Sequence, residues 1–246
     1  GILFMCTAHD ESVLPWLDAL DVPAFKIGSG ERSNLPYFRE IARRGKPVIL
    51  STGMYELDHV RQALQVFSEG GCRELALLHC VTSYPTPYDQ VNLRAMDALR
   101  AVFPGPVGYS DHTRGHHVCL AAVACGATIL EKHITLDFDV PNAQDWKVSA
   151  GPEDFAAFVR SVREVEAALG DGAKRPAPSE TAALAWALKS LVAARPLLRG
   201  SVLAEGMLLA KRPGGGIEPS RLPDVLGRAL RRDLEADEAL TWSDLE

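Results

Sequence analysis

Short apolar runs rich in β-forming residues alternate with amphipathic stretches of helical period along residues 2–169. Successive runs start about 20–30 residues apart, which leaves room for a helix to cross over between parallel strands. This alternation is typical of α/β proteins with a parallel sheet. The expected strands are Ile2–Cys6, Ala24–Ile27, Pro47–Leu50, Leu75–Leu78, Pro106–Tyr109 and Thr128–Leu130. The expected helices are Ser12–Leu20, Leu35–Arg43, Leu57–Ser68, Leu93–Val102, His117–Cys125 and Pro152–Leu169.

Polar or ionisable residues follow every one of the six apolar runs. One polar residue after a strand can simply begin a loop, but six in succession favour a shared site. In a (β/α)₈ barrel the active site lies at this carboxyl end of the strands. We therefore expect an α/β fold, a (β/α)₈ TIM barrel lacking its first two strands. A six-stranded doubly wound sheet is the alternative, but no GxGxxG follows the first run.

The two ends of the chain differ in character from the alternating region. Residue 1 is Gly and a strand-like run follows at once, so we expect a fragment whose true N-terminus lies upstream. Residues 170–180 are polar and rich in Gly and Pro, which is typical of a linker. We predict a partial barrel domain over 1–169, a linker over 170–187 and a small, mostly β domain over 188–246.

The charge and cysteine content exclude several classes of protein. The chain has 26 Lys and Arg against 32 Asp and Glu, a net charge of −6, which argues against nucleic-acid or anionic-membrane binding. The longest mostly apolar run, Val118–Leu130, is shorter than the roughly 20 residues that span a membrane. Five cysteines without a CxxC pair indicate reduced thiols and a cytoplasmic protein.

Two histidines, His112 and His133, follow the last two expected strands. Neighbouring strands lie about 4.8 Å apart, so the two imidazoles could share a divalent first-row metal ion. Taken alone, the pair is equally compatible with two unrelated histidines. Because neighbouring strand residues face opposite ways, we expect Asp111 and Glu131 to lie outside the ligand set.

Hydroxyl side chains and one lysine occupy the ends of several expected strands. Lys26 with Ser29, Ser51 and Ser110 could cradle a phosphate, and Thr7 would join them from the first run. Each serine could instead cap its strand. Lys46 and Lys132 are expected to be structural lysines.

Two further features are open to more than one interpretation. The prolines after Tyr84 predict a rigid loop that holds this ring over a pocket or packs on the surface. A Cys80–His79 nucleophilic pair is the rival chemistry, but neighbouring strand residues face opposite ways and no orienting group is evident.

Seven short motifs occur in a fixed order. They are Lys26-Ile-Gly-Ser-Gly-Glu31, Leu50-Ser-Thr-Gly-Met54, Leu78-His-Cys80, Tyr84-Pro-Thr-Pro87, Gly108-Tyr-Ser-Asp-His-Thr113, Leu130-Glu-Lys-His133 and Lys211-Arg-Pro-Gly214. Each motif is weak by itself, but the ordered set is specific. Together they resemble the sialic acid synthase family over essentially the whole chain.

This resemblance implies a barrel followed by an antifreeze-like (SAF) domain, and a condensation reaction. Phosphoenolpyruvate and an N-acyl hexosamine resembling N-acetylmannosamine would give a nonulosonic acid and phosphate. The implied cofactor is Mn²⁺, with Mg²⁺ or Co²⁺ as substitutes, held by His112 and His133. Thr7, Lys26, Ser29, Ser51 and Ser110 match the phosphoenolpyruvate pocket, and Glu31 and Tyr84 match contacts to the amino sugar.

The resemblance also implies an assembly and shows departures. Arg212 matches an arginine that reaches into the neighbouring subunit's site, which implies a domain-swapped homodimer. Thr82 stands where the family often has Asn, and Asp145 follows a segment one residue longer than usual. The family's two N-terminal residues, a Glu and a Lys that bind substrate, have no counterpart, so we expect this fragment alone to be inactive. Another phosphoenolpyruvate–sugar aldol-type synthase, or a non-catalytic sugar-binding scaffold, remains the alternative.

Overall fold

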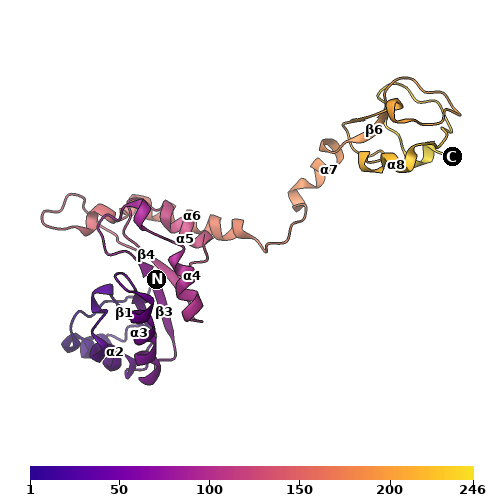
Figure 1. Ribbon diagram of the computed structural model, residues 1–246. Coiled ribbons are helices and arrows are strands. Elements are labelled where there is room, and N and C mark those ends of the chain that lie inside the picture. Colours follow the sequence, from indigo (N-terminus) through magenta and orange to yellow (C-terminus); the bar gives the residue numbers. More distant parts are fainter. The chain divides into compact units, whose positions relative to one another are not determined.

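Five parallel strands in the order β1-β2-β3-β4-β5 form the centre of residues 1–172 in the computed structural model, which describes residues 1–246 (Figure 1). Their bounds are Phe25–Ile27, Val48–Ser51, Leu75–Cys80, Val107–Asp111 and Leu130–Lys132. Each pairs only with its sequence neighbours, as successive strand–helix units require. Five of the six predicted strands are therefore confirmed.

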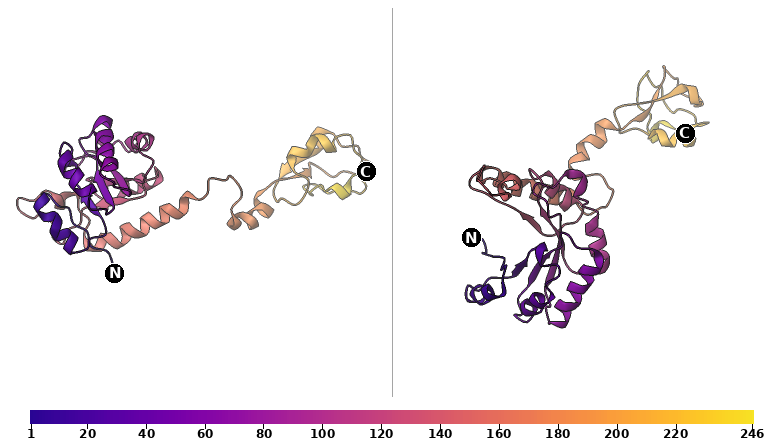
Figure 2. Two further views of the ribbon diagram at one scale, coloured as in Figure 1. Left: turned by 90° about the horizontal axis from the view of Figure 1, so that it is seen from below. Right: turned by 60° about the vertical axis from the view of Figure 1, so that its left-hand side comes forward.

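Helices connect these strands and cover one face of the sheet (Figure 2). They are α1 (Leu14–Ala19), α2 (Leu35–Ala42), α3 (Leu57–Glu69), α4 (Ala95–Val102), α5 (His117–Ala124) and α6 (Pro152–Leu169). Strand residues such as Phe25, Leu50 and Leu77 pack there against helix residues such as Phe38 and Phe67. Burial of these large side chains stabilises the layer, since each buried aliphatic or aromatic group contributes about 1.5–3 kcal/mol.

The sheet curls so that its other face is concave. β1 and β5 are its two edges, yet Lys26 on β1 lies 3.3 Å from the carboxylate of Glu131 on β5. A flat sheet of five strands would hold its edge strands about 19 Å apart. The five strands therefore form part of the wall of a barrel, and side chains of the concave face converge at its carboxyl end.

The predicted strand Ile2–Cys6 is wrong. Its side chains are exposed, with Ile2 at 100%, Leu3 at 80% and Phe4 at 63%. Only Thr7, just beyond it, forms a single parallel bridge to Lys26. The run has a β-forming composition. Within the described chain, however, no strand pairs with residues 2–6 and no helix layer buries their side chains.

The second unit comprises residues 173–246. Helix α7, Thr181–Ala187, lies within the segment expected to be a linker. Strands β6 (Ser190–Ala193) and β7 (Leu208–Lys211) pair antiparallel, and isolated bridges such as Leu197–Leu234 extend the pairing. A separate core that includes Leu191, Leu203, Val225, Leu230 and Leu240 lies beneath them.

Two further observations concern the cysteines and the helices. All five cysteines are free, as expected for a chain without a disulfide framework. None of the helices combines the length and the apolar character needed to cross a membrane.

Candidate functional site

A pocket of about 360 Å³ lies at the carboxyl end of the concave face. It takes in every site residue predicted from the sequence except Glu31 and Arg212. Those that line it are Thr7, Lys26, Ser29, Ser51, Thr82, Tyr84, Ser110, His112, His133 and Asp145. His9, Gly28, Gly30, Cys80 and Glu131 complete the lining. Five neighbouring strands thus contribute to one polar site, as parallel strands with aligned ends do.

Lys26 holds the only ammonium group among the lining residues. Its side chain is 12% exposed, and its Nζ donates to Ser51 Oγ at 2.9 Å and to the Ile27 carbonyl at 3.3 Å. Its ion pair with Glu131 is 3.3 Å long. Ser110 Oγ donates to the other carboxylate oxygen of Glu131 at 2.6 Å. One cation and two hydroxyls are therefore preorganised around a carboxylate that an incoming anion could replace.

Gly53, just after β2, lets three loops approach one another at the edge of this cluster. A Cβ at this position would lie 2.4 Å from Thr82 Oγ1 and 2.8 Å from Ser29 Oγ. Its backbone N–H donates to Ser29 Oγ at 2.9 Å. Only glycine allows this close approach, which brings the hydroxyls of Ser29 and Thr82 to the same part of the pocket.

His112 is buried at the end of β4, and its ring has a defined tautomer. Its Nδ1 lies 2.7 Å from the Val81 carbonyl oxygen, which can only accept, so Nδ1 carries the proton and Nε2 the lone pair. Burial lowers the pKa of His112, which keeps the imidazole neutral near neutral pH. A neutral ring with a free Nε2 is the form that binds metal ions.

His133 and Tyr84 complete an aromatic cluster around His112. The ring centres of His112 and His133 lie 5.2 Å apart, and Tyr84 stacks on His112 at 4.1 Å. Burial, together with nearby acidic groups, raises the pKa of Tyr84 to about 12, so its hydroxyl stays protonated. Asp145 approaches His133 Nδ1 at 3.7 Å from the 3₁₀ helix Asp145–Val148. This distance is too long for a hydrogen bond, so Asp145 is a neighbour of His133 and not its hydrogen-bond partner.

These residues fit a divalent ion as a two-histidine site. No group of three or more His, Cys, Asp and Glu side chains is arranged to hold a metal ion. The chain therefore offers the imidazoles of His112 and His133, and further ligands would be water or substrate oxygens. Such a mixed nitrogen and oxygen donor set suits first-row divalent ions.

Glu131 is the site residue that sequence reasoning missed. It was expected to lie outside the metal-ligand set, and it lies in the pocket beside Lys26, where no role had been assigned to it. Glu131 is two residues before His133, and side chains two apart on a strand share a face. Counting the alternation from His133 would have placed it correctly.

The alternation of side chains along a strand correctly predicts other residues that face away from the pocket. Lys132 points away from the pocket and pairs with Asp111, as expected for a structural lysine. Lys46 likewise pairs with Asp21 at 2.7 Å. His79 lies on the outer face, where its Nε2 approaches the Val91 carbonyl, while Cys80 lines the pocket.

Glu31 and Arg212 are not part of this pocket. Glu31 ends the short 3₁₀ helix Ser29–Glu31, and its carboxylate accepts from Asn34 at 2.7 Å. Arg212 belongs to the second unit, where its guanidinium lies 5.9 Å from the centre of the Trp186 ring. The prediction that Arg212 reaches the site of a neighbouring subunit stays a prediction.

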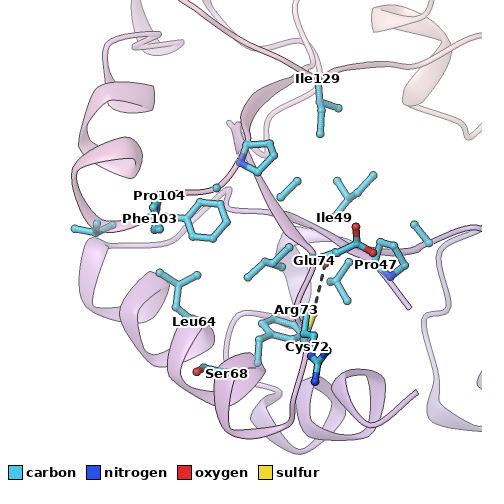
Figure 3. A pocket seen from close by; sticks show the side chains of 18 residues that line it. Pro47, Ile49, Leu64, Ser68, Cys72, Arg73, Glu74, Phe103, Pro104 and Ile129 are labelled. Carbon is cyan, nitrogen blue, oxygen red and sulfur yellow. Dashed lines mark hydrogen bonds between the residues drawn. The ribbon is translucent and has the colours of Figure 1, made fainter. Parts of the chain in front are cut away.

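A second cavity, of about 800 Å³, lies at the opposite, amino end of the strands (Figure 3). Figure 3 shows its mainly apolar lining, which includes Ile49, Phe103, Pro104 and Ile129. Apart from Arg73, Glu74 and Cys72, its walls carry no ionisable side chain. Because it lacks converging polar groups, we do not regard it as the reaction site.

Comparison with known proteins agrees with this geometry. Residues 1–174 match the NeuB family, and residues 189–246 match the SAF domain. The N,N'-diacetyllegionaminic acid synthase of Campylobacter jejuni is 41% identical over 242 residues, which cover 98% of this chain and 72% of that protein. Human N-acetylneuraminate-9-phosphate synthase is 36% identical, over 98% of this chain and 67% of that protein.

A solved structure shows the same fold. The N-acetylneuraminic acid synthetase of Leptospira borgpetersenii matches with a TM-score of 0.68 and 36% identity, over 74% of this chain and 64% of that one. The chain thus spans about two thirds of the length of these relatives. On the extent of these matches, it belongs to the NeuB family of acid synthases and carries a SAF domain.

Proposed function

We propose that this site takes part in the condensation of phosphoenolpyruvate with an N-acyl hexosamine, which gives a nonulosonic acid and phosphate. The observation that carries the proposal is the convergence of Lys26, two serine hydroxyls and the His112–His133 pair in one pocket. The first group suits a phosphate, and the second suits a metal-bound carbonyl. Named relatives of the chain make acids of this class.

Lys26, Ser51 and Ser110 are proposed to bind the phosphate of phosphoenolpyruvate. Glu131 contacts two of these donors, at 3.3 Å to Lys26 and 2.6 Å to Ser110. An incoming phosphate would take over these charge-assisted hydrogen bonds. The Glu131 carboxylate would then be free to accept a hydrogen bond from the sugar or from water.

His112 and His133 are proposed to hold a divalent ion, with Mn²⁺ as the first choice. When bound, such an ion supplies Lewis-acid polarisation of the sugar aldehyde. The chain's own part is to hold both imidazoles in place. The Val81 carbonyl fixes the tautomer of His112, and the Asp145 carboxylate lies 3.7 Å from His133 Nδ1.

The condensation proceeds in three steps: attack by phosphoenolpyruvate, addition of water and loss of phosphate. The C3 carbon of phosphoenolpyruvate attacks the aldehyde carbon of the open-chain sugar, and the aldehyde oxygen takes a proton. The C2=C3 π electrons form this new bond, so C2 becomes an oxocarbenium centre. Water adds there and loses a proton, and the hydroxyl then loses its own proton as the bond from C2 to the phosphate oxygen breaks, which leaves a ketone and free phosphate. The pocket's main contribution is to hold the two substrates in a reactive arrangement, which can supply a large share of the rate. Tyr84, neutral and stacked on His112, is proposed to contact the sugar.

The first test is binding, because the proposed phosphate donors Lys26, Ser51 and Ser110 all line the pocket. Titration calorimetry with phosphoenolpyruvate, in the presence of Mn²⁺ and then of a chelator, should show specific binding. Lys26→Met should weaken it, whereas Lys46→Met, which alters a lysine outside the pocket, should not. Equal affinity in both variants would contradict the proposed phosphate site.

The second test is turnover. Phosphate release would be measured with phosphoenolpyruvate, Mn²⁺ and a panel of N-acyl hexosamines, with and without a phosphate group at C6. Release that depends on one sugar and stops with chelator would support the proposal and name the substrate. Phosphoenolpyruvate binding without release for any sugar, in a folded protein of its relatives' full length, would favour the sugar-binding scaffold.

A further inference from the structure

A buried polar cluster lies behind the two histidines, on the opposite face of β4 and β5. At its centre Lys132 Nζ lies 2.7 Å from Asp111 Oδ2, and the two side chains are 3% and 0% exposed. Tyr109 Oη donates to Asp111 Oδ1 at 2.9 Å. Cys119 on α5 donates its S–H to Asp111 Oδ2 at 3.4 Å. None of these groups reaches the pocket, so the proposed reaction does not use them directly.

The cluster fixes the backbone on both sides of His112. Asp111, the residue before it, is held by the contacts just described. Thr113, the residue after it, donates its N–H to Asp111 Oδ1 at 2.9 Å, and its carbonyl accepts from Lys132 Nζ at 2.6 Å. His112 itself donates no bond to this cluster. Its backbone is thus clamped at both neighbours while its ring points into the pocket.

The same pair also connects His112 to His133. Asp111 and Lys132 are register partners on adjacent strands, and Lys132 directly precedes His133. The Asp111–Lys132 contact therefore joins the two strand ends from which the imidazoles project. Since side chains alternate on a strand, a lock on the outer face sets the position of the next residue on the inner face.

We propose that the buried Asp111–Lys132 pair is a positioning device that holds His112 and His133 at the separation needed to share one ion. This inference rests on the proposed function, which assigns the two histidines to a metal ion. Asp111 and Lys132 are positioning residues that touch neither substrate nor ion. A buried ion pair is weak evidence for stability, because an apolar replacement is often equally stable. The place of this pair directly behind the two histidines is better explained by a geometric role.

The test uses Asp111→Asn combined with Lys132→Met, which removes the ion pair without leaving a buried charge. Mn²⁺ affinity would be measured from the electron paramagnetic resonance signal of free Mn²⁺. The histidine Cε1–Hε1 signals of the metal-free chain would be recorded by NMR and assigned with His112→Asn and His133→Asn. We expect at least a tenfold loss of Mn²⁺ affinity and displaced signals for both rings, at an unfolding free energy close to that of the parent.

The chain offers a matched control in Lys46, which pairs with Asp21 and also donates to the Val22 carbonyl at 2.8 Å. Asp21→Asn with Lys46→Met should change neither the Mn²⁺ affinity nor the two histidine signals. If the double variant in the cluster fails to fold, Asp111→Asn with Lys132→Gln keeps polar groups at both positions, leaves no buried charge and should displace the same two histidine signals.

The outcomes separate this inference from the proposed function. Unchanged His112 and His133 signals and unchanged Mn²⁺ affinity in the cluster variants would overturn the positioning role. If the parent chain binds no Mn²⁺, the metal assignment fails. The ring signals then still decide whether Asp111 and Lys132 position the two histidines.

Discussion

Two lysine–carboxylate pairs on the same sheet show how surroundings decide what such a pair does. Lys26–Glu131 crosses the concave face at 3.3 Å, and its side chains are 12% and 38% exposed. Lys132–Asp111 lies on the convex face at 2.7 Å and is almost fully buried. Glu131 and Lys132 are neighbours in sequence, so a single step along β5 separates the two environments.

The two pairs differ in whether the carboxylate partner of the lysine can be replaced. Around Lys26 water and ligands can enter, and the carboxylate partner can be replaced by a phosphate at modest cost. Around Lys132 no other partner is available, because Asp111 and the Thr113 carbonyl are enclosed with it. The partly exposed Lys26–Glu131 pair is therefore suited to binding a ligand. The buried Asp111–Lys132 pair is suited to fixing the positions of the two strand ends. The following predictions test this contrast.

Lys132→Met should have the largest effect on folding. It leaves the Asp111 carboxylate buried without its counter-charge, which in other proteins costs about 3–5 kcal/mol of unfolding free energy. Urea unfolding at neutral pH would measure it. Adding Asp111→Asn to this variant should restore most of the loss, and a loss that persists in the double variant would mean that packing, rather than charge, was responsible.

Lys26→Met should instead weaken ligand binding. A charge-assisted hydrogen bond is worth about 1.5–3 kcal/mol, so phosphoenolpyruvate affinity should fall by about 10- to 100-fold. The unfolding free energy should change by less than about 1 kcal/mol, because Glu131 can be hydrated once its partner is gone. Titration calorimetry and urea unfolding on the same preparation check both parts. The reverse pattern, lost stability with intact affinity, would remove the distinction between the two pairs.

The buried Asp111–Lys132 pair should also make the unfolding free energy of the chain fall at acid pH. Burial by itself would raise the pKa of Asp111, but the hydrogen bond and charge of Lys132 and the Thr113 N–H hold it below its usual range. The unfolded chain then binds the proton more readily, at a pKa of about 3.9. This stabilisation is complete above that pH and is lost as the pH falls through the folded pKa.

Urea unfolding from pH 7 to pH 3 would test this dependence. The parent chain should lose more stability on acidification than the Asp111→Asn, Lys132→Met double variant, which has no carboxylate to protonate at this position. Parallel curves for the two proteins would show that Asp111 titrates alike in the folded and unfolded states.

Glu131→Gln should give the smallest change, and in the favourable direction. Glutamine keeps an acceptor for Ser110 Oγ but removes the negative charge that competes for Lys26. We expect phosphoenolpyruvate to bind about 2- to 5-fold more tightly, in line with a partly exposed ion pair of about 0.2–1 kcal/mol. Weaker binding in calorimetry would show that Glu131 assists the anion instead of occupying its place.

Much of the site was predictable because it follows from alternation on parallel strands. Lys26, Ser110 and His112 could be placed at strand ends from the apolar runs before them, and all three line the pocket. The predicted strand Ile2–Cys6 failed because composition does not reveal whether a run has a neighbour to pair with. Glu131 was assigned no role in the pocket, although the alternation counted from His133 places it there.

By itself, the sequence determined the order of strands and helices and the residue types at each strand end, because these depend on local periodicity. Only the tertiary structure decided which of those residues meet. The curl of the sheet brings Lys26 of one edge strand to Glu131 of the other, 105 residues away, as no local pattern could show. The tertiary structure also decided that Asp111 and Lys132 lie buried together, since burial depends on which parts of the sheet the helices cover.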